Sequence, residues 1–133
     1  MTLDADPPVE AIASRVLGCA MKVHTELGPG LLESAYEICL HRELSKVGMR
    51  SERQLALPIA YDGERLDAGY RLDLLVEELV VVEIKSVDRL LPIHTAQVLT
   101  YLRLGGFPLG LLLNFNVPHM RNGIRRVLPL RRK

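Results

Sequence analysis

The stretch YRLDLLVEELVVVEIK, residues 70–85, contains two apolar runs, and each run is interrupted by a carboxylate. Val, Ile and Leu dominate both runs, which favours two strands, and the two acidic residues between them mark a turn. Side chains alternate between the faces of a strand, so Glu83 and Lys85 share one face of the second strand. Charge is costly to bury unless it is paired or binds a metal. This hairpin therefore decides both the fold and the candidate chemistry.

Asp73 lies on the first of these strands, and its position relative to Glu83 depends on the loop between them. A three-residue loop (77–79) places the two acids directly opposite each other, whereas a two-residue loop puts them on opposite faces. In the first case, two carboxylates and Lys85 suit a hard cation such as Mg²⁺. Such a cation activates a bound water and screens charge on a phosphate, which is the chemistry of phosphodiester hydrolysis. The alternative is a surface ion pair between Glu83 and Lys85.

The rest of the chain predicts helices and further strands around this hairpin. Apolar residues recur at three- and four-residue steps over 8–27 and 31–47, and the third predicted helix covers 92–104. Asp62-Gly63 follows an alternating run and predicts a hairpin turn. The predicted order is α-α-β-β-β-β-α-β-β, an α/β (α+β) fold with a mixed sheet flanked by helices.

Length and composition indicate one globular domain over 1–133, because 133 residues with 48% hydrophobic content can bury an independent core. Residues 1–8 are expected to form a flexible N-terminal extension, and 129–133 a flexible basic tail. No run of about 18 apolar residues is present, and the acidic start is unlike a secretory signal. Cys19 and Cys39 fit free thiols in a reducing cytosol, so a cytoplasmic location is expected, with no membrane partner.

The charge is unevenly distributed along the chain. Residues 1–120 hold all 16 acidic residues against 11 basic ones, whereas 121–133 hold six basic residues and no acid. Such a basic end can neutralise phosphates, and its predicted nucleic-acid-binding residues are Arg121, Arg125, Arg126, Arg131 and Arg132. The alternative is a solubilising tail. Because Trp is absent and aromatics make up 5% of the chain, a surface that binds mainly by stacking several bases is not expected.

The acids and the lysine resemble a known pattern. Asp73, a nine-residue gap and then Glu83-Ile84-Lys85 are similar to the motif of the PD-(D/E)XK nuclease superfamily, although Leu72 stands where its name has proline. The stretch GLLESAY, residues 30–36, resembles the motif of the GxxExxY proteins, a bacterial branch of that superfamily. The likeness extends from about 23 to 128. It implies a restriction-endonuclease-like core of order α-β-β-β-α-β.

The resemblance also implies site residues and a cofactor. Mg²⁺ or Mn²⁺ would be bound by Asp73, Glu83, Glu33 and the backbone carbonyl of Ile84. Without the resemblance, Glu33, Tyr36 and Glu37 share one helix face, a pattern that favours a solvated helix surface.

A further implied motif lies in the third predicted helix. Gln97 and Tyr101 resemble the Gln-x-x-x-Tyr motif of RecB-type exonucleases and would complete the catalytic set of Asp73, Glu83, Lys85 and Glu33. The alternative is a tyrosine packed at the edge of the core. His94, about one turn earlier, is a weaker candidate for the same cleft.

Together these patterns predict a divalent-metal-dependent nuclease that hydrolyses phosphodiester bonds, with DNA favoured over RNA as the substrate. The alternative is a non-catalytic module that binds nucleic acid or protein and retains the nuclease fold. A homodimer is a third expectation, because many superfamily nucleases act as pairs.

Overall fold

The computed structural model describes residues 6–130. Its helices are α1 (Pro7–Leu27), α2 (Glu33–Lys46), α3 (Pro92–Gly105) and the short 3-10 helix η1 (Met120–Gly123). Its strands are β1 (Ser51–Ala56), β2 (Ile59–Tyr61), β3 (Glu64–Leu66), β4 (Arg71–Val76), β5 (Val80–Lys85), β6 (Leu109–Asn114) and β7 (Ile124–Val127). The predicted mixed sheet flanked by helices is therefore confirmed.

Five strands form the main sheet in the order β1-β4-β5-β6-β7. The β5–β6 pair is parallel, and the other neighbours are antiparallel. The parallel pair requires a crossover, and α3 provides it. Strands β5 and β6 lie at the centre of the sheet and are buried almost throughout, which explains why their sequences are continuous apolar runs rather than alternating ones.

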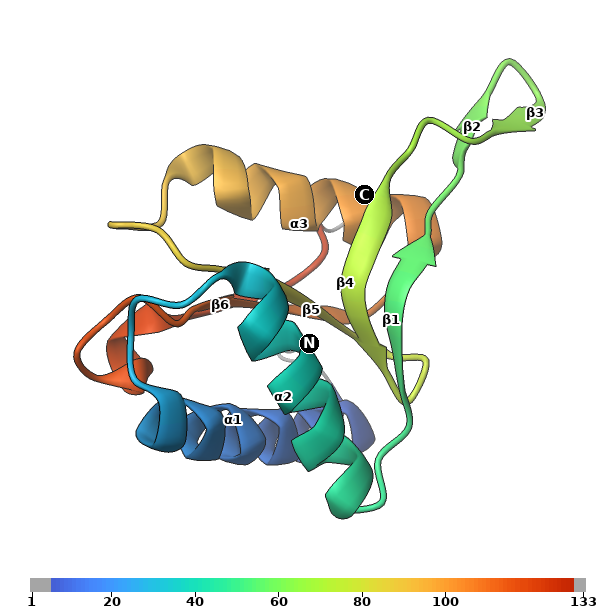
Figure 1. Ribbon diagram of the computed structural model, residues 1–133. Helices are drawn as coiled ribbons and strands as arrows, with labels where there is room; N and C mark the ends of the chain where they lie inside the picture. Colours follow the sequence, from blue (N-terminus) through green and yellow to red (C-terminus); the bar gives the residue numbers. More distant parts are fainter. Residues whose placement is uncertain (1–5, 131–133) are drawn as a thin grey trace.

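Helices cover both faces of the sheet, so the fold has three layers (Figure 1). Apolar faces of α1 and α2 pack against one face of the sheet, and α3 packs against the other. Alternating residues of β5 divide between the two cores: Val80, Val82 and Ile84 join the first, whereas Val81 joins the second. Glu83 follows in the register of Val81, so the strand directs it toward the face that α3 covers.

Two expectations about element boundaries need correction. The alternating run that predicted one strand ending at Asp62-Gly63 is divided in two, because the chain leaves the main sheet at Leu57 and Pro58. Proline has no amide hydrogen for a ladder, which explains the break. The order of elements consequently contains one more strand before α3 than predicted. The turn at Asp62-Gly63 is confirmed and joins β2 to β3, a hairpin that projects beyond the main sheet (Figure 1).

The N-terminal boundary also differs from the expectation. The predicted extension 1–8 overlaps α1, which begins at Pro7 because the Asp6 carboxylate accepts a hydrogen bond from the Val9 amide at 3.2 Å. The rest of that extension, and residues 131–133 of the predicted tail, lie outside the described residues. Within 6–130, none of the helices has the length and apolarity that a bilayer crossing requires. Cys19 and Cys39 are free thiols, as expected.

Candidate active site

The turn between β4 and β5 has the three-residue loop on which the candidate site depends. Val76 pairs with Val80 and Leu74 pairs with Val82, so three residues lie between the strands. Continuing this register by one residue sets Asp73 opposite Glu83. The predicted juxtaposition of the two carboxylates is therefore what the structure shows.

The two acids are linked through the backbone as well as by register. Glu83 Oε1 accepts a hydrogen bond from the Asp73 amide at 3.0 Å, and Asp73 Oδ2 accepts one from the Ile84 amide at 2.8 Å. The backbone pairing of β4 with β5 ends at Leu74–Val82. The carboxylates accept hydrogen bonds from the Asp73 and Ile84 amides, which lie beyond the last pair of the ladder. Each carboxylate oxygen has two lone pairs, so both groups retain capacity for another ligand.

Glu83 is only 6% exposed, and its neighbours disfavour its charge. Burial, followed by the charge of Asp73, raises the pKa of Glu83 from 4.5 to about 8, and the Lys85 ammonium acts in the opposite direction. Lys85 is therefore close enough to act on the acid electrostatically, and strand alternation places it on the same face. A buried carboxylate beside a half-buried one would gain stability from a bound cation.

Glu33 is placed beside this site but does not join the acid pair. It is exposed at the start of α2, and its Oε2 accepts a hydrogen bond from the Ser86 amide at 3.3 Å, just after β5. Among residues 6–130, no group of three or more His, Cys, Asp or Glu side chains is arranged to hold a metal ion. The acidic centre in this structure is therefore the pair Asp73 and Glu83, and Glu33 of α2 lies beside the end of β5.

Tyr36 explains part of the motif in residues 30–36. Its ring is fully buried and stacks on Phe115, with the ring centroids 4.5 Å apart. Its hydroxyl donates a hydrogen bond to the Gly28 carbonyl at 2.6 Å and accepts one from the Leu31 amide at 3.1 Å. The buried tyrosine thus holds the α1–α2 loop in place from the core side. A solvated helix surface, the alternative that the sequence left open, is wrong for Tyr36.

The same loop is tied to the end of β5. Ser86 donates its hydroxyl to the Leu31 carbonyl at 2.7 Å, and its amide contacts Glu33 as described above. Because Tyr36 holds this loop and Ser86 fastens it, the start of α2 is placed next to Lys85.

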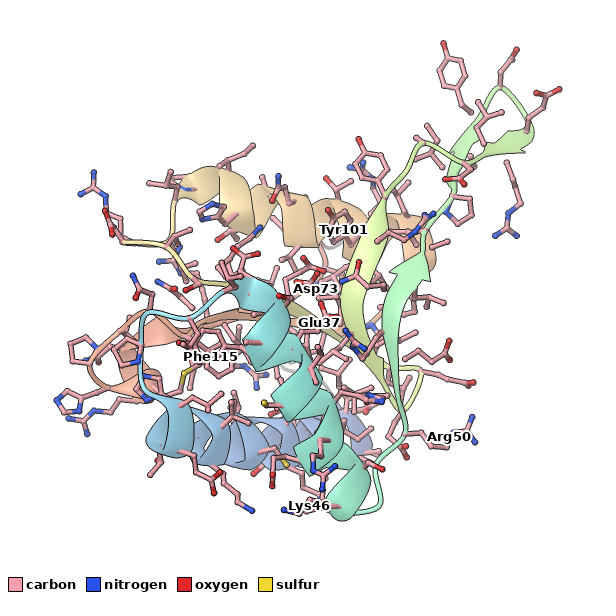
Figure 2. All side chains as sticks on the ribbon, viewed as in Figure 1. Glu37, Lys46, Arg50, Asp73, Tyr101 and Phe115 are labelled. Atoms are coloured by element: carbon pink, nitrogen blue, oxygen red, sulfur yellow. The ribbon has the colours of Figure 1, made fainter. Side chains whose placement is uncertain are left out.

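Glu37, one turn after Glu33, is the acid of α2 that reaches the pair most directly. It is 5% exposed, and burial raises its pKa. Its carboxylate accepts hydrogen bonds from Arg53 at 3.1 Å and from Gln54 at 2.6 Å, and Gln54 also donates to Asp73 Oδ1 at 3.3 Å. Figure 2 shows Glu37 and Asp73 between α2 and α3. The sequence indicated that Glu37 shares a face with Glu33, but nothing in it singled out Arg53 or Gln54.

Tyr101 approaches the acid pair from α3. It is half-buried, and burial, then the charges of Glu83 and Asp73, raise its pKa. Its ring also meets Tyr70 edge-on, with centroids 6.1 Å apart. Gln97, one turn earlier on the same helix, is exposed. His94 has a structural role, because its Nδ1 accepts a hydrogen bond from the Leu91 amide at 2.9 Å and so caps the start of α3.

The predicted basic residues do not share one surface. Arg125 contacts the hydroxyl of Thr95 on α3 at 3.4 Å, whereas Arg126 forms an ion pair with Glu10 on α1. Consecutive residues of β7 therefore point to opposite faces of the sheet, as strand geometry requires. Arg121 is exposed in η1. Arg131 and Arg132 lie outside the described residues.

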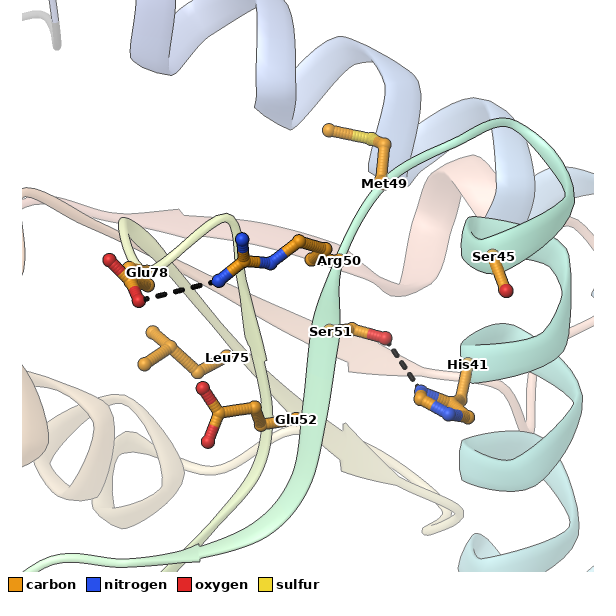
Figure 3. A pocket seen from close by; sticks show the side chains of 8 residues that line it. All are labelled: His41, Ser45, Met49, Arg50, Ser51, Glu52, Leu75 and Glu78. Atoms are coloured by element: carbon orange, nitrogen blue, oxygen red, sulfur yellow. Dashed lines mark hydrogen bonds and ion pairs between the residues drawn. The ribbon is translucent and has the colours of Figure 1, made fainter.

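A cavity of about 350 Å³ lies at the other end of the β4–β5 hairpin (Figure 3). There His41 Nδ1 and Ser51 Oγ are 2.6 Å apart, and Arg50 pairs with Glu78 at 3.7 Å. Both acids that line it, Glu52 and Glu78, are exposed, whereas in the pair at the open end of the strands Glu83 is buried and Asp73 is half-buried. The acid pair is therefore the stronger candidate for metal-assisted chemistry.

The fold and the acid pair together define a class of protein. Elements α2, β1, β4, β5, α3 and β6 follow the order α-β-β-β-α-β, with an Asp and a Glu on adjacent strands and a Lys two residues after the Glu. This is the arrangement of a restriction-endonuclease-like nuclease fold.

Residues 10–127 match the PD-(D/E)XK nuclease superfamily, and the chain belongs to it. The narrower likeness to the GxxExxY proteins stays a prediction, with which the contacts of Tyr36 are compatible. No curated protein matches the chain, and no solved structure does.

Proposed function

We propose that this protein is a divalent-metal-dependent nuclease that hydrolyses phosphodiester bonds of DNA, with RNA as the less favoured substrate. The observation that carries the proposal is the pair of a buried Glu83 and a half-buried Asp73 on adjacent strands, with Lys85 acting on Glu83 electrostatically. Membership of a nuclease superfamily supports the reaction class. Nucleic acid is accordingly the proposed partner.

The donor set fits a hard cation. Asp73 and Glu83 provide carboxylate oxygens, and Mg²⁺ commonly uses one or two carboxylates and retains several waters. Oxygens of Asp73, Glu83 and the Ile84 carbonyl would hold Mg²⁺ or Mn²⁺. Glu33, at the start of α2 beside the end of β5, would contact the metal through a water. When bound, the cation supplies an activated water and stabilises negative charge on the phosphate.

The remaining groups act on the nucleic acid. Lys85 carries an ammonium on the same face as Glu83 and would stabilise the additional charge on phosphorus as the bond breaks. Gln97 and Tyr101 on α3 would hold the phosphate or order the carboxylates, with the protonated Tyr101 hydroxyl as a hydrogen-bond donor. Arg121, Arg125, Arg126, Arg131 and Arg132 are proposed to contact the nucleic-acid backbone, Arg125 from the face of α3 and Arg126 from the face of α1.

The proposed setting is the cytoplasm of a bacterium, and residues 1–133 are proposed to act as one nuclease-like domain. The three-layer core over most of 6–130 supports the single domain. A homodimer is the proposed assembly, and light scattering of the purified protein tests it.

The decisive experiment is a cleavage panel of single-stranded, double-stranded and branched DNA together with RNA, with Mg²⁺, with Mn²⁺ and with a chelator. Wild-type protein should cut at least one DNA substrate in a metal-dependent manner. Asp73→Ala and Lys85→Ala should each abolish cutting, whereas Glu52→Ala, an exposed strand acid near the turn, should not. Cutting that survives both of the first two substitutions refutes the proposal.

A second function is favoured by one observation. Because residues 6–130 show an acid pair and no larger cluster of metal-binding side chains, a non-catalytic module that binds nucleic acid or protein is the alternative. Calorimetry with millimolar Mn²⁺ separates the two. Binding that disappears in Glu83→Ala supports the nuclease, and absence of binding to the wild type supports the module.

A further inference from the structure

Gln54 occupies an irregular position in β1, directly beside the acid pair. The β1–β4 ladder pairs Arg53 with Leu74 and Leu55 with Leu72, and it omits the intervening pair of Gln54 with Asp73. The φ angle of Gln54 is +52°, in the left-handed region that Gly and Asn adopt most readily. Because Gln is an unfavourable residue for this backbone, its presence here points to a role for its side chain.

The side-chain amide of Gln54 contacts two carboxylates at once. Its Nε2 donates to Glu37 Oε1 at 2.6 Å and to Asp73 Oδ1 at 3.3 Å, and a primary amide has two hydrogens to give. Glu37 is itself held in place, because it is buried and its other oxygen accepts from Arg53. The chain of contacts therefore runs from α2 through Gln54 to the acid on β4.

We infer that Gln54 is a positioning residue for Asp73, anchored by Glu37, and that it orients the Asp73 carboxylate toward the metal. Asp73 Oδ2 is held from β5 by the Ile84 amide, and Oδ1 is held from β1 by Gln54. With each oxygen held from a different strand, the carboxylate cannot rotate freely. Mutation of a residue that orients a metal ligand typically lowers metal affinity or activity by about 10- to 100-fold. The metal-binding part of this inference rests on the proposed function.

A simpler role would be to fasten α2 to β1 through Glu37. That role predicts lower stability for Gln54 variants and no selective change at Asp73. The two roles therefore differ in what happens to metal affinity and to the hydrogen bond between Ile84 and Asp73.

The test uses two substitutions of Gln54 in the full chain. Gln54→Met keeps the chain length but removes the donor, and Gln54→Gly removes the donor while suiting the left-handed backbone. Asp62→Gly is the matched control, because Asp62 has a φ of +53° in the β2–β3 turn. The measurements are Mn²⁺ affinity by calorimetry and hydrogen exchange of the Ile84 amide relative to that of Leu112 on β6, both without nucleic acid.

Both Gln54 variants should bind Mn²⁺ about tenfold more weakly or worse and should exchange the Ile84 amide faster, whereas Asp62→Gly should change neither. Wild-type affinity in both variants overturns the inference. If the wild type binds no Mn²⁺, the proposed function fails, and unchanged Ile84 exchange in the variants then also overturns the positioning of Asp73. If either Gln54 variant fails to fold, Glu37→Gln, which removes the charge that anchors the amide, should show the same two changes, and their absence overturns the inference.

Discussion

Replacing Glu83 by Gln should stabilise the metal-free protein at high pH, although it removes a proposed metal ligand. Burial and the charge of Asp73 raise the pKa of Glu83 to about 8, whereas a glutamate in an unfolded chain titrates near 4.3. Between these values the folded protein keeps a proton that the unfolded chain has released. The contribution of Glu83 to stability is therefore fully present below about pH 4.5 and is lost as the pH rises through about 8. Gln imitates the protonated acid, so the variant should lack this loss.

The size of the effect follows from the pKa. Each pKa unit corresponds to about 1.4 kcal/mol, so a rise from 4.5 to about 8 sets an upper limit of about 5 kcal/mol at pH 9. Local relaxation and water entry reduce this value, and we expect a gain of about 2 kcal/mol or more for Glu83→Gln at pH 9. At pH 5 the two proteins should be nearly equal. The Gln carbonyl can still accept from the Asp73 amide, and its NH₂ can donate to the Asp73 carboxylate.

Urea denaturation at pH 5 and pH 9, in the presence of a chelator, measures both free energies of unfolding. Glu78→Gln, at an exposed position in the turn of the same hairpin, is the control and should follow the wild type. Millimolar Mg²⁺ should then stabilise the wild type at pH 9 and leave Glu83→Gln unchanged. Equal stability of Glu83→Gln and wild type at pH 9 would refute the electrostatic reasoning. Stabilisation of both proteins by Mg²⁺ would refute Glu83 as a ligand.

Three further substitutions test the fold by urea denaturation. Tyr36→Phe removes the hydroxyl that ties the α1–α2 loop and should cost about 1–3 kcal/mol, whereas Tyr61→Phe at the exposed hairpin should cost nothing measurable. Gly18→Ala should add about 0.5–1 kcal/mol, because this exposed helical position has open space for a methyl group. Gly123→Ala should cost more than about 2 kcal/mol, because its Cβ would collide with the Asn114 carbonyl oxygen. A stable Gly123→Ala or a weakened Gly18→Ala contradicts the packing.

The sequence predicted the acid pair because strand geometry leaves few choices. Once residues 70–85 form a hairpin, the side-chain period of two and the loop length decide whether Asp73 faces Glu83. The three helices follow in the same way from apolar periodicity and from Gly and Pro at their ends. These features depend on local geometry, which can be predicted from a single sequence.

The network around the pair could not be predicted, because it depends on tertiary contacts. Gln54 adopts a positive φ in the middle of a strand, a conformation for which its residue type gives no signal. Glu37 is buried because α2 packs against β1, and this contact joins residues that are far apart in the chain. His94 was the weaker candidate for the cleft, and the sequence did not indicate that its ring accepts a hydrogen bond from the Leu91 amide.

Strand β4 gives up regular pairing on both of its sides at Asp73. Toward β1 the ladder omits Gln54, and toward β5 it ends at Leu74–Val82. The amides of Asp73 and Ile84 donate instead to the carboxylates of Glu83 and Asp73, and the Gln54 side chain donates to the Asp73 carboxylate; these three side chains are the groups proposed to bind and position a cation. An interruption of this kind would weaken an isolated hairpin. It is tolerated here because the residues of β4 on both sides of Asp73, Leu72 and Leu74–Val76, are buried between the two helical layers, so the site is built at an interruption within a firmly packed strand.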